Sequence, residues 1–212
     1  MLWIIGASAL CLGCCLPLFV IYKRSLQLPL ACAFKALGTL CALILALVAA
    51  IRLDPGCYIV VIALALHLLG DIALEYHFLL GMGFFMAGHI AYISFFLRLW
   101  PVSVLHVVLL LAFLAITAYI LYQWRKPAGK QMPLFSVYAA VLCVMCACAL
   151  GGGFSSYTLP GILIGIGAAM FYVSDALILR RTLFPAPKSL EWPIMILYYG
   201  AQLLFGASCL LL

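Results

Sequence analysis

Eight apolar runs of about 20 residues, separated by short polar breaks, constrain the fold of this chain more than any other feature. A helical run of about this length matches the thickness of the bilayer core. Lipid offers the backbone no hydrogen bonds, so membrane-spanning segments are either helices or strands of a closed barrel. The alternation of apolar and polar residues that barrel strands show is absent here, and helices are therefore predicted.

These runs predict one integral membrane domain that covers residues 1–212. The predicted spans are about 2–22, 30–51, 57–75, 78–97, 102–123, 133–151, 160–179 and 191–212. Composition agrees, because 69% of the residues are hydrophobic and 8% are charged, whereas a soluble domain carries about 25% charged residues. No break is long enough for a soluble domain. We therefore predict an all-α polytopic membrane bundle with eight transmembrane helices.

The distribution of Lys and Arg predicts the orientation of the bundle. The odd-numbered breaks hold eight of these residues, whereas the even-numbered breaks hold Arg52 and Arg98. The odd-numbered breaks should therefore face the cytoplasm, with both termini on the other side. The first run is followed by Lys23 and Arg24 and lacks a basic segment before it, which favours a retained span over a cleaved signal peptide. Short loops favour a bacterial inner membrane, and the scattered basic residues predict no nucleic-acid partner.

Three charged residues lie inside predicted spans and away from the span ends, where a charge is costly and is by default a functional hypothesis. Lys35, Asp71 and Asp175 all fall in the predicted cytoplasmic half. Two acids facing one lysine leave a carboxylate in surplus, which favours a functional site over a purely structural pairing. Further polar residues should turn inward and join the same pocket; they are His67, His89, Tyr92, Tyr198, Tyr199 and Gln202.

A short internal similarity links the two acids. The sequence GDIAL at 70–74 resembles SDALI at 174–178, and both stretches end a predicted span on the same side. Two parallel halves of four helices each would explain this similarity. Glu75 and His77 follow the first stretch and are expected to be solvated in a turn. The ten cysteines lie almost entirely in apolar runs, as small hydrophobic residues do, so no metal, disulfide or cofactor is predicted.

The polar motifs resemble a known family. Gly70-Asp71, Gly88-His89 with Tyr92, Ser174-Asp175 and Tyr198-Tyr199 with Gln202 occur in the order typical of the YhhN family of membrane proteins, which includes the lysoplasmalogenases. The resemblance extends from about Lys35 to Gln202. It implies hydrolysis of the vinyl ether bond of a lysophospholipid substrate, a lysoplasmalogen, within the membrane. The products would be a fatty aldehyde and glycerophosphoethanolamine or glycerophosphocholine.

The chemistry of vinyl ether hydrolysis suits such a pocket. One acid must protonate the alkene carbon, and one carboxylate must stabilise positive charge and activate water, in parallel with the two carboxylates of glycoside hydrolysis. Asp71 and Asp175 are expected to form this acid–base pair, with either order of roles, and His89 to relay a proton or orient water. The residues expected to bind the substrate are Lys35, Tyr92, Ser174, Tyr198, Tyr199 and Gln202.

Two alternatives remain open at this point. A metal-dependent membrane lipid amidohydrolase could use His67, His89 and the two aspartates as zinc ligands, although these histidines are more scattered than in typical catalytic zinc sites. A small-solute transporter or lipid sensor could use intramembrane acids for proton coupling. A transporter, however, is expected to bind its substrate near the bilayer midplane with access from both sides.

Overall fold

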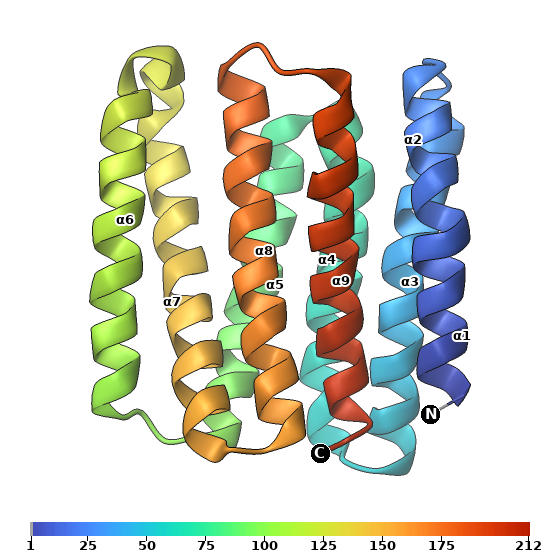
Figure 1. The fold of residues 1–212 in the computed structure, drawn as a ribbon, viewed down its shortest axis with the longest axis vertical. Coiled ribbons are helices and arrows are strands. Elements are labelled where there is room, and N and C mark those ends of the chain that lie inside the picture. The colour runs from blue at the N-terminus through green and yellow to red at the C-terminus, as the bar shows by residue number, and fades with distance from the viewer. Residues whose placement is uncertain (1) are drawn as a thin grey trace.

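The computed structural model describes residues 2–212, which form helices joined by short turns and contain no strand (Figure 1). The α-helices are α1 (Leu2–Leu10), α2 (Leu16–Arg24), α3 (Leu28–Arg52), α4 (Tyr58–Tyr76), α5 (Phe78–Leu99), α6 (Val104–Ala128), α7 (Met132–Ser156), α8 (Leu159–Leu183) and α9 (Glu191–Cys209). A π-helical turn, η1 (Cys11–Cys15), joins α1 and α2 into one rod. The 3-10 turns are η2 (Pro55–Cys57), η3 (Gly129–Gln131) and η4 (Lys188–Leu190).

Six helical segments of the described chain are long and apolar enough to cross a membrane. One of them, Val104–Ser156, contains both α6 and α7, which η3 joins. The predicted all-α membrane fold is therefore confirmed as a class. The first segment, Leu2–Arg24, is continuous through its π-helical turn.

The α1–α2 rod and each helix that follows it run in alternating directions, so the beginning of α1 and the C-terminus lie at the same end of the bundle (Figure 1). The opposite end, here called the basic end, carries the turns at residues 25–27, 77, 129–131 and 184–190. Its Lys and Arg residues are those of the odd-numbered breaks: Lys23, Arg24, Arg125, Lys126, Lys130, Arg180, Arg181 and Lys188.

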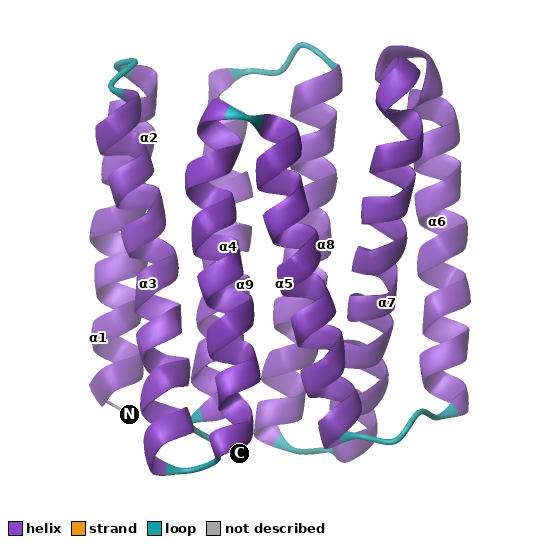
Figure 2. Ribbon diagram, turned by 180° about the vertical axis from the view of Figure 1, so that it is seen from behind, coloured by secondary structure: helices purple, strands orange, loops and turns teal. Residues whose placement is uncertain are grey.

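Six helices form a closed ring in which α3, α4, α5, α7, α8 and α9 each pack on the next, and α9 returns to α3. Helices α8 and α9 lie on one face (Figure 1), and α4 and α5 lie on the opposite face (Figure 2). The α1–α2 rod packs outside α3, and α6 packs outside α7. Side chains on the inner faces of the ring helices therefore meet in its interior.

Glycines allow α7 and α8 to approach closely at the end remote from the basic end. A Cβ atom added to Gly153 would lie 2.3 Å from the carbonyl oxygen of Gly161. A Cβ atom added to Gly161 would lie 2.7 Å from the carbonyl oxygen of Gly153. Small residues allow such contacts between helices in membranes. The two helices are thus pinned together near their connecting turn.

Gly153→Ala should separate α7 from α8, because the new methyl group meets a backbone atom that cannot rotate away. We expect it to lower the free energy of unfolding by about 1–3 kcal/mol. Gly83→Ala is the matched control, since a Cβ atom at Gly83 would contact nothing within 4 Å. This control should leave stability unchanged or raise it by about 0.5–1 kcal/mol. Thermal unfolding in detergent measures both; equal shifts would contradict the close contact.

Candidate active site between two aspartates

Asp71 projects from α4 into the ring, where it is fully buried between α3 and α9. Thr39 and Tyr198 both donate hydrogen bonds to its Oδ2 atom, the latter at 2.8 Å. Lys35 Nζ lies 3.7 Å from Oδ1, which has no hydrogen-bond partner. Opposite charge and hydrogen-bond donors stabilise an ionised carboxylate. One oxygen of Asp71 is therefore fixed by two hydroxyls, while the other is buried beside the Lys35 ammonium group.

A cluster of ion pairs closes the basic end above Asp71. Glu75 Oε1 lies 3.0 Å from the ammonium groups of both Lys23 and Lys35. Lys23 also pairs with Glu191 at 3.1 Å, and Glu191 in turn accepts from Arg181. The cluster joins α2, α3, α4, α8 and α9. Positive and negative side chains alternate in it, so the charges compensate one another.

The prediction that Glu75 is solvated in a turn is wrong. Helix α4 continues to Tyr76, which places Glu75 one turn after Asp71 on the same inward face. Its side chain is only 7% exposed, and the two lysines neutralise it. His77, which follows α4, is exposed as predicted.

Asp175 projects from α8 and has a different set of partners. Tyr138 of α7 donates a hydrogen bond to Asp175 Oδ2. His89 Nε2 lies 3.7 Å from the same oxygen and 3.1 Å from the Tyr138 hydroxyl. Because Tyr138 gives its proton to Asp175, its oxygen can accept the Nε2 proton of His89. Asp175 therefore has a neutral hydroxyl as its nearest partner, where Asp71 has Lys35 in addition to its hydroxyls.

A deeper network fixes the side chains behind Asp71. The Gln202 amide nitrogen donates to Tyr198 OH at 3.0 Å and to His67 Nδ1 at 2.9 Å, while Tyr92 OH donates to the Gln202 amide oxygen at 3.1 Å. Since His67 Nδ1 accepts, Nε2 carries the proton and donates to the Phe85 carbonyl oxygen at 3.3 Å. All of these polar groups are buried. Gln202 and Tyr92 thus orient Tyr198 from behind.

Tyr199 and Ser174 bond to backbone carbonyls. Tyr199 OH donates to the Lys35 carbonyl oxygen at 3.1 Å, and Ser174 Oγ donates to that of Ile194 at 3.0 Å. Both side chains are buried and hold α9 against α3 and α8. Neither lines the cavities described below, so their role in substrate binding remains a prediction for which this geometry gives no support.

The two aspartates meet at one internal space, here called the polar cavity. It is small, with a volume of about 10 Å³. Its polar lining consists of Lys35, Asp71, Asp175, Arg181, Glu191 and Tyr198. The predicted meeting of the third and seventh spans therefore occurs in the structure, where α4 and α8 bring the acids to the same cavity. Of the other predicted residues, Lys35 and Tyr198 also line it.

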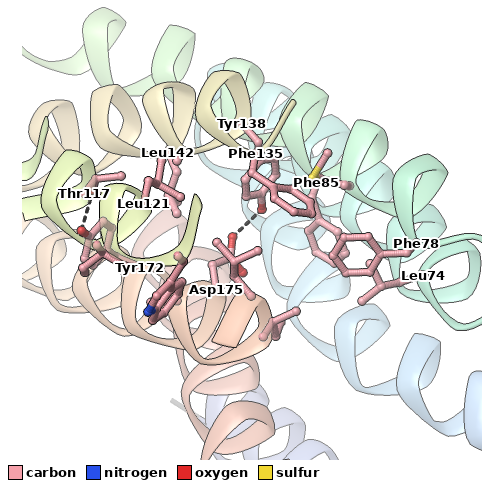
Figure 3. A pocket seen from close by; sticks show the side chains of 17 residues that line it. Leu74, Phe78, Phe85, Thr117, Leu121, Phe135, Tyr138, Leu142, Tyr172 and Asp175 are labelled. Carbon is pink, nitrogen blue, oxygen red and sulfur yellow. Dashed lines mark hydrogen bonds between the residues drawn. The ribbon is translucent and has the colours of Figure 1, made fainter. Parts of the chain in front are cut away.

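A second, larger space adjoins the polar cavity (Figure 3). This apolar cavity has a volume of about 80 Å³ and is partly open to the outside. Its lining includes Phe78, Leu121, Trp124, Phe135, Tyr172 and Leu179. Both cavities include Asp175 in their lining, together with Leu74, Phe85 and Ile178. Asp175 thus stands where a polar chamber meets a hydrocarbon-like one.

Thr39, Glu75, Tyr138 and the apolar cavity itself were not predicted from the sequence as parts of a site. A hydroxyl at 39 or 138 in an apolar run has no distinctive signal. The spacing of Asp71 and Glu75 by four residues could have indicated a shared helix face. No group of three or more His, Cys, Asp or Glu side chains in residues 2–212 is arranged to hold a metal ion. The geometry therefore gives the metal-dependent alternative no ligand set.

Tyr198→Phe should weaken the fold, because it removes the hydroxyl that links Asp71 to Gln202. One buried amide N–H and one carboxylate oxygen would each lose a partner, which costs about 1–3 kcal/mol. Tyr119→Phe is the control, since Tyr119 is 66% exposed on the outer face of α6. Unfolding temperatures of the two variants in detergent would compare them; similar small shifts would mean that the network contributes little.

These features define an integral membrane protein whose helices enclose a two-acid site near one end. Residues 30–209 match the sequence profile of the YhhN family, and the chain belongs to that family. The family resemblance of the polar motifs is thereby confirmed. No curated protein and no solved structure matched the chain.

Proposed function

We propose that this protein is a membrane hydrolase that cleaves the vinyl ether bond of lysoplasmalogens, releasing a fatty aldehyde and glycerophosphoethanolamine or glycerophosphocholine. The observation that carries this proposal is the junction at Asp175 between the polar and apolar cavities. A single-chain ether lipid likewise has a polar part and an apolar part, and its reactive bond lies between the polar head group and the hydrocarbon chain. Membership of the YhhN family supports a membrane hydrolase of this type.

Asp175 is the proton donor in this proposal. Its nearest partner is the neutral Tyr138 hydroxyl, and it lines the apolar cavity in which the alkene would lie. It transfers its proton to the alkene carbon that does not carry oxygen, and the ether carbon becomes part of an oxocarbenium ion. His89, which contacts Tyr138, orients this pair from behind.

Asp71 is the carboxylate that stabilises this cation and activates water. Lys35 and two hydroxyls support its charge. Water adds to the oxocarbenium carbon and gives a proton to Asp71, which produces a hemiacetal. When the hemiacetal collapses, its hydroxyl proton returns to Asp175, and Asp71 protonates the departing glycerol oxygen. Both acids are then restored, and the products are the aldehyde and the alcohol.

The remaining lining of the polar cavity suits a phospholipid head group. Arg181 and Lys35 supply cationic donors, and Glu191 supplies an acceptor beside them. Guanidinium and ammonium groups both bind phosphate, the former in a planar bidentate geometry. Tyr198 lies within the same lining and is the residue proposed to meet the glycerol oxygens.

We further propose that eight rods cross the membrane as two parallel halves of four. Three features support this arrangement: the α1–α2 rod packs on α3 as α6 packs on α7, the hairpins α4–α5 and α8–α9 occupy opposite faces, and Asp71 and Asp175 occupy matching places in α4 and α8. The basic end would face the cytoplasm of a bacterial inner membrane, since cytoplasmic loops carry an excess of Lys and Arg.

The proposal is tested by incubating the purified protein with lysoplasmalogen, intact plasmalogen and a diacyl phospholipid, and by measuring aldehyde. We expect aldehyde from the lysoplasmalogen and little from the other two. Absence of aldehyde from all three would overturn the proposed activity. Uptake of a solute by proteoliposomes without any lipid cleavage would favour transport instead.

A further inference from the structure

Helices α7 and α8 diverge toward the basic end. Gly153 and Gly161 pin them together at the opposite end, whereas the apolar cavity lies between them near Asp175. The walls include the small side chains of Ala139 on α7 and Ala176 on α8. Figure 3 shows Asp175 and Tyr138 in the middle of this space, with Leu74 and Phe78 toward one side and Thr117 and Tyr172 toward the other. The space is therefore a passage that leads outward from the ring interior.

Helix α6 covers the outer side of this passage. Its inner face contributes Thr117, Ile120, Leu121 and Trp124 to the lining. Residues on its other faces, such as Ile116 and Tyr119, are exposed and would contact lipid. Of its 25 residues, the buried ones are His106, Leu121 and Ala128. A helix with so few buried side chains is held weakly and can move more easily than the ring helices.

Two contacts fasten α6 to α8 across the passage. The hydroxyls of Thr117 and Tyr172 lie 2.7 Å apart and form a hydrogen bond. Nearer the basic end, the Trp124 ring packs edge-on against the Phe184 ring, with centroids 5.7 Å apart. The cavity residue Leu121 lies between these two contacts in the sequence of α6. The contacts thus lie on either side of Leu121 along the passage.

The other approach to Asp175 is polar. It runs through the polar cavity, whose mouth at the basic end is crossed by the ion pairs of Glu75 and Glu191. A hydrocarbon chain drawn past these groups would strip water from charges without offering hydrogen bonds in return, which is costly. The passage under α6 carries no such cost, because its lining is almost entirely apolar.

We propose that the hydrocarbon chain of a single-chain lipid reaches Asp175 sideways from the bilayer, through the passage between α7 and α8, and lies beneath α6 during the reaction. This inference rests on the proposed function for the identity of the lipid. It assigns a chain-binding role to Ala139, Ala176, Leu121 and Thr117. Asp175 lies eight residues before the end of α8, or about 12 Å along its axis. The reactive bond next to the glycerol group would meet it at that depth.

A photoreactive lipid tests this route without requiring turnover. The probe is a lysophosphatidylethanolamine with a saturated alkyl ether in place of the vinyl ether and a diazirine on a chain carbon close to the ether oxygen. After irradiation of the protein in lipid nanodiscs, peptides are mapped by mass spectrometry. We expect adducts within residues 117–124 of α6 and 172–179 of α8 that excess lysoplasmalogen displaces. Displaceable adducts concentrated on α1, α2 or α9 would overturn the proposed route.

Ala176→Phe should block the passage. We expect displaceable labelling and aldehyde release to fall by at least about tenfold, as for an overfilled packed site. Val173→Phe is the matched control on the same helix, where Val173 is 46% exposed toward lipid, and it should retain both signals. Leu121→Trp introduces the larger side chain on α6 and is the second blocking variant, used if Ala176→Phe does not fold. Folded blocking variants with unchanged labelling and release would refute the route, whereas a wild-type protein that is labelled but releases no aldehyde would refute only the proposed function.

Discussion

Asp175→Asn is expected to cause a large loss of aldehyde release. Asparagine has nearly the same shape as aspartate and can still accept the Tyr138 hydrogen bond, but it cannot give a proton to carbon. General acid catalysis contributes about 10²–10⁴-fold, so turnover should fall by at least about 100-fold. The measurement is aldehyde formation from lysoplasmalogen by purified wild type and variant at equal concentration.

The interpretation of this variant requires an intact fold. Asp175 is 10% exposed and pairs with no lysine or arginine within residues 2–212, so the exchange should change the unfolding temperature little. Asp54→Asn is a suitable control, since Asp54 pairs with Arg98 at the end of the bundle remote from the site. A folded Asp175→Asn variant that retains turnover within tenfold of wild type would remove this residue from the reaction.

Asp71→Asn is expected to reduce turnover by at least about 100-fold as well, because the amide cannot accept the proton of the attacking water. Thr39 and Tyr198 can still donate to the amide oxygen, and Lys35 keeps its 3.0 Å pair with Glu75. The network around the site should therefore survive the exchange. Turnover and unfolding temperature are measured together, as for Asp175→Asn.

The double variant separates cooperation from independent effects. If both acids serve one proton cycle, removal of the second should add little to removal of the first, since residues that act as a unit show strongly non-additive losses. We therefore expect the Asp71→Asn/Asp175→Asn variant to lie close to the slower single variant. A loss equal to the product of the two single losses would show that the acids act independently.

The fold could largely be predicted from the sequence because one physical cost dominates it. Lipid excludes both unsatisfied backbone groups and unpaired charges, so apolar run length located the helices, and rarity of charge located Asp71, Asp175 and Lys35. The ends of the helices were predicted less accurately than their positions in the sequence. The predicted span 57–75 ended at Glu75, which was therefore assigned to the turn, whereas α4 continues to Tyr76.

The parts of the site that the sequence did not reveal depend on contacts between distant helices. Tyr138 lies near the beginning of α7, where a tyrosine is typical of a membrane interface, and only the packing of α7 on α8 brings it to Asp175. The apolar cavity arises from the divergence of two helices, which no local pattern encodes. Apolar residues such as Leu121 and Ala176 give the same sequence pattern whether they face lipid, a neighbouring helix or a cavity.

The most direct test of the two-aspartate mechanism follows the proton. Lysoplasmalogen is hydrolysed by the purified protein in D₂O, the aldehyde is reduced at once to its alcohol, and the position of deuterium is determined by mass spectrometry and NMR. The account predicts one deuterium on the carbon next to the former aldehyde carbon, and no such product from either Asp→Asn variant. An aldehyde formed without deuterium at that carbon, or formed equally by both variants, would contradict it.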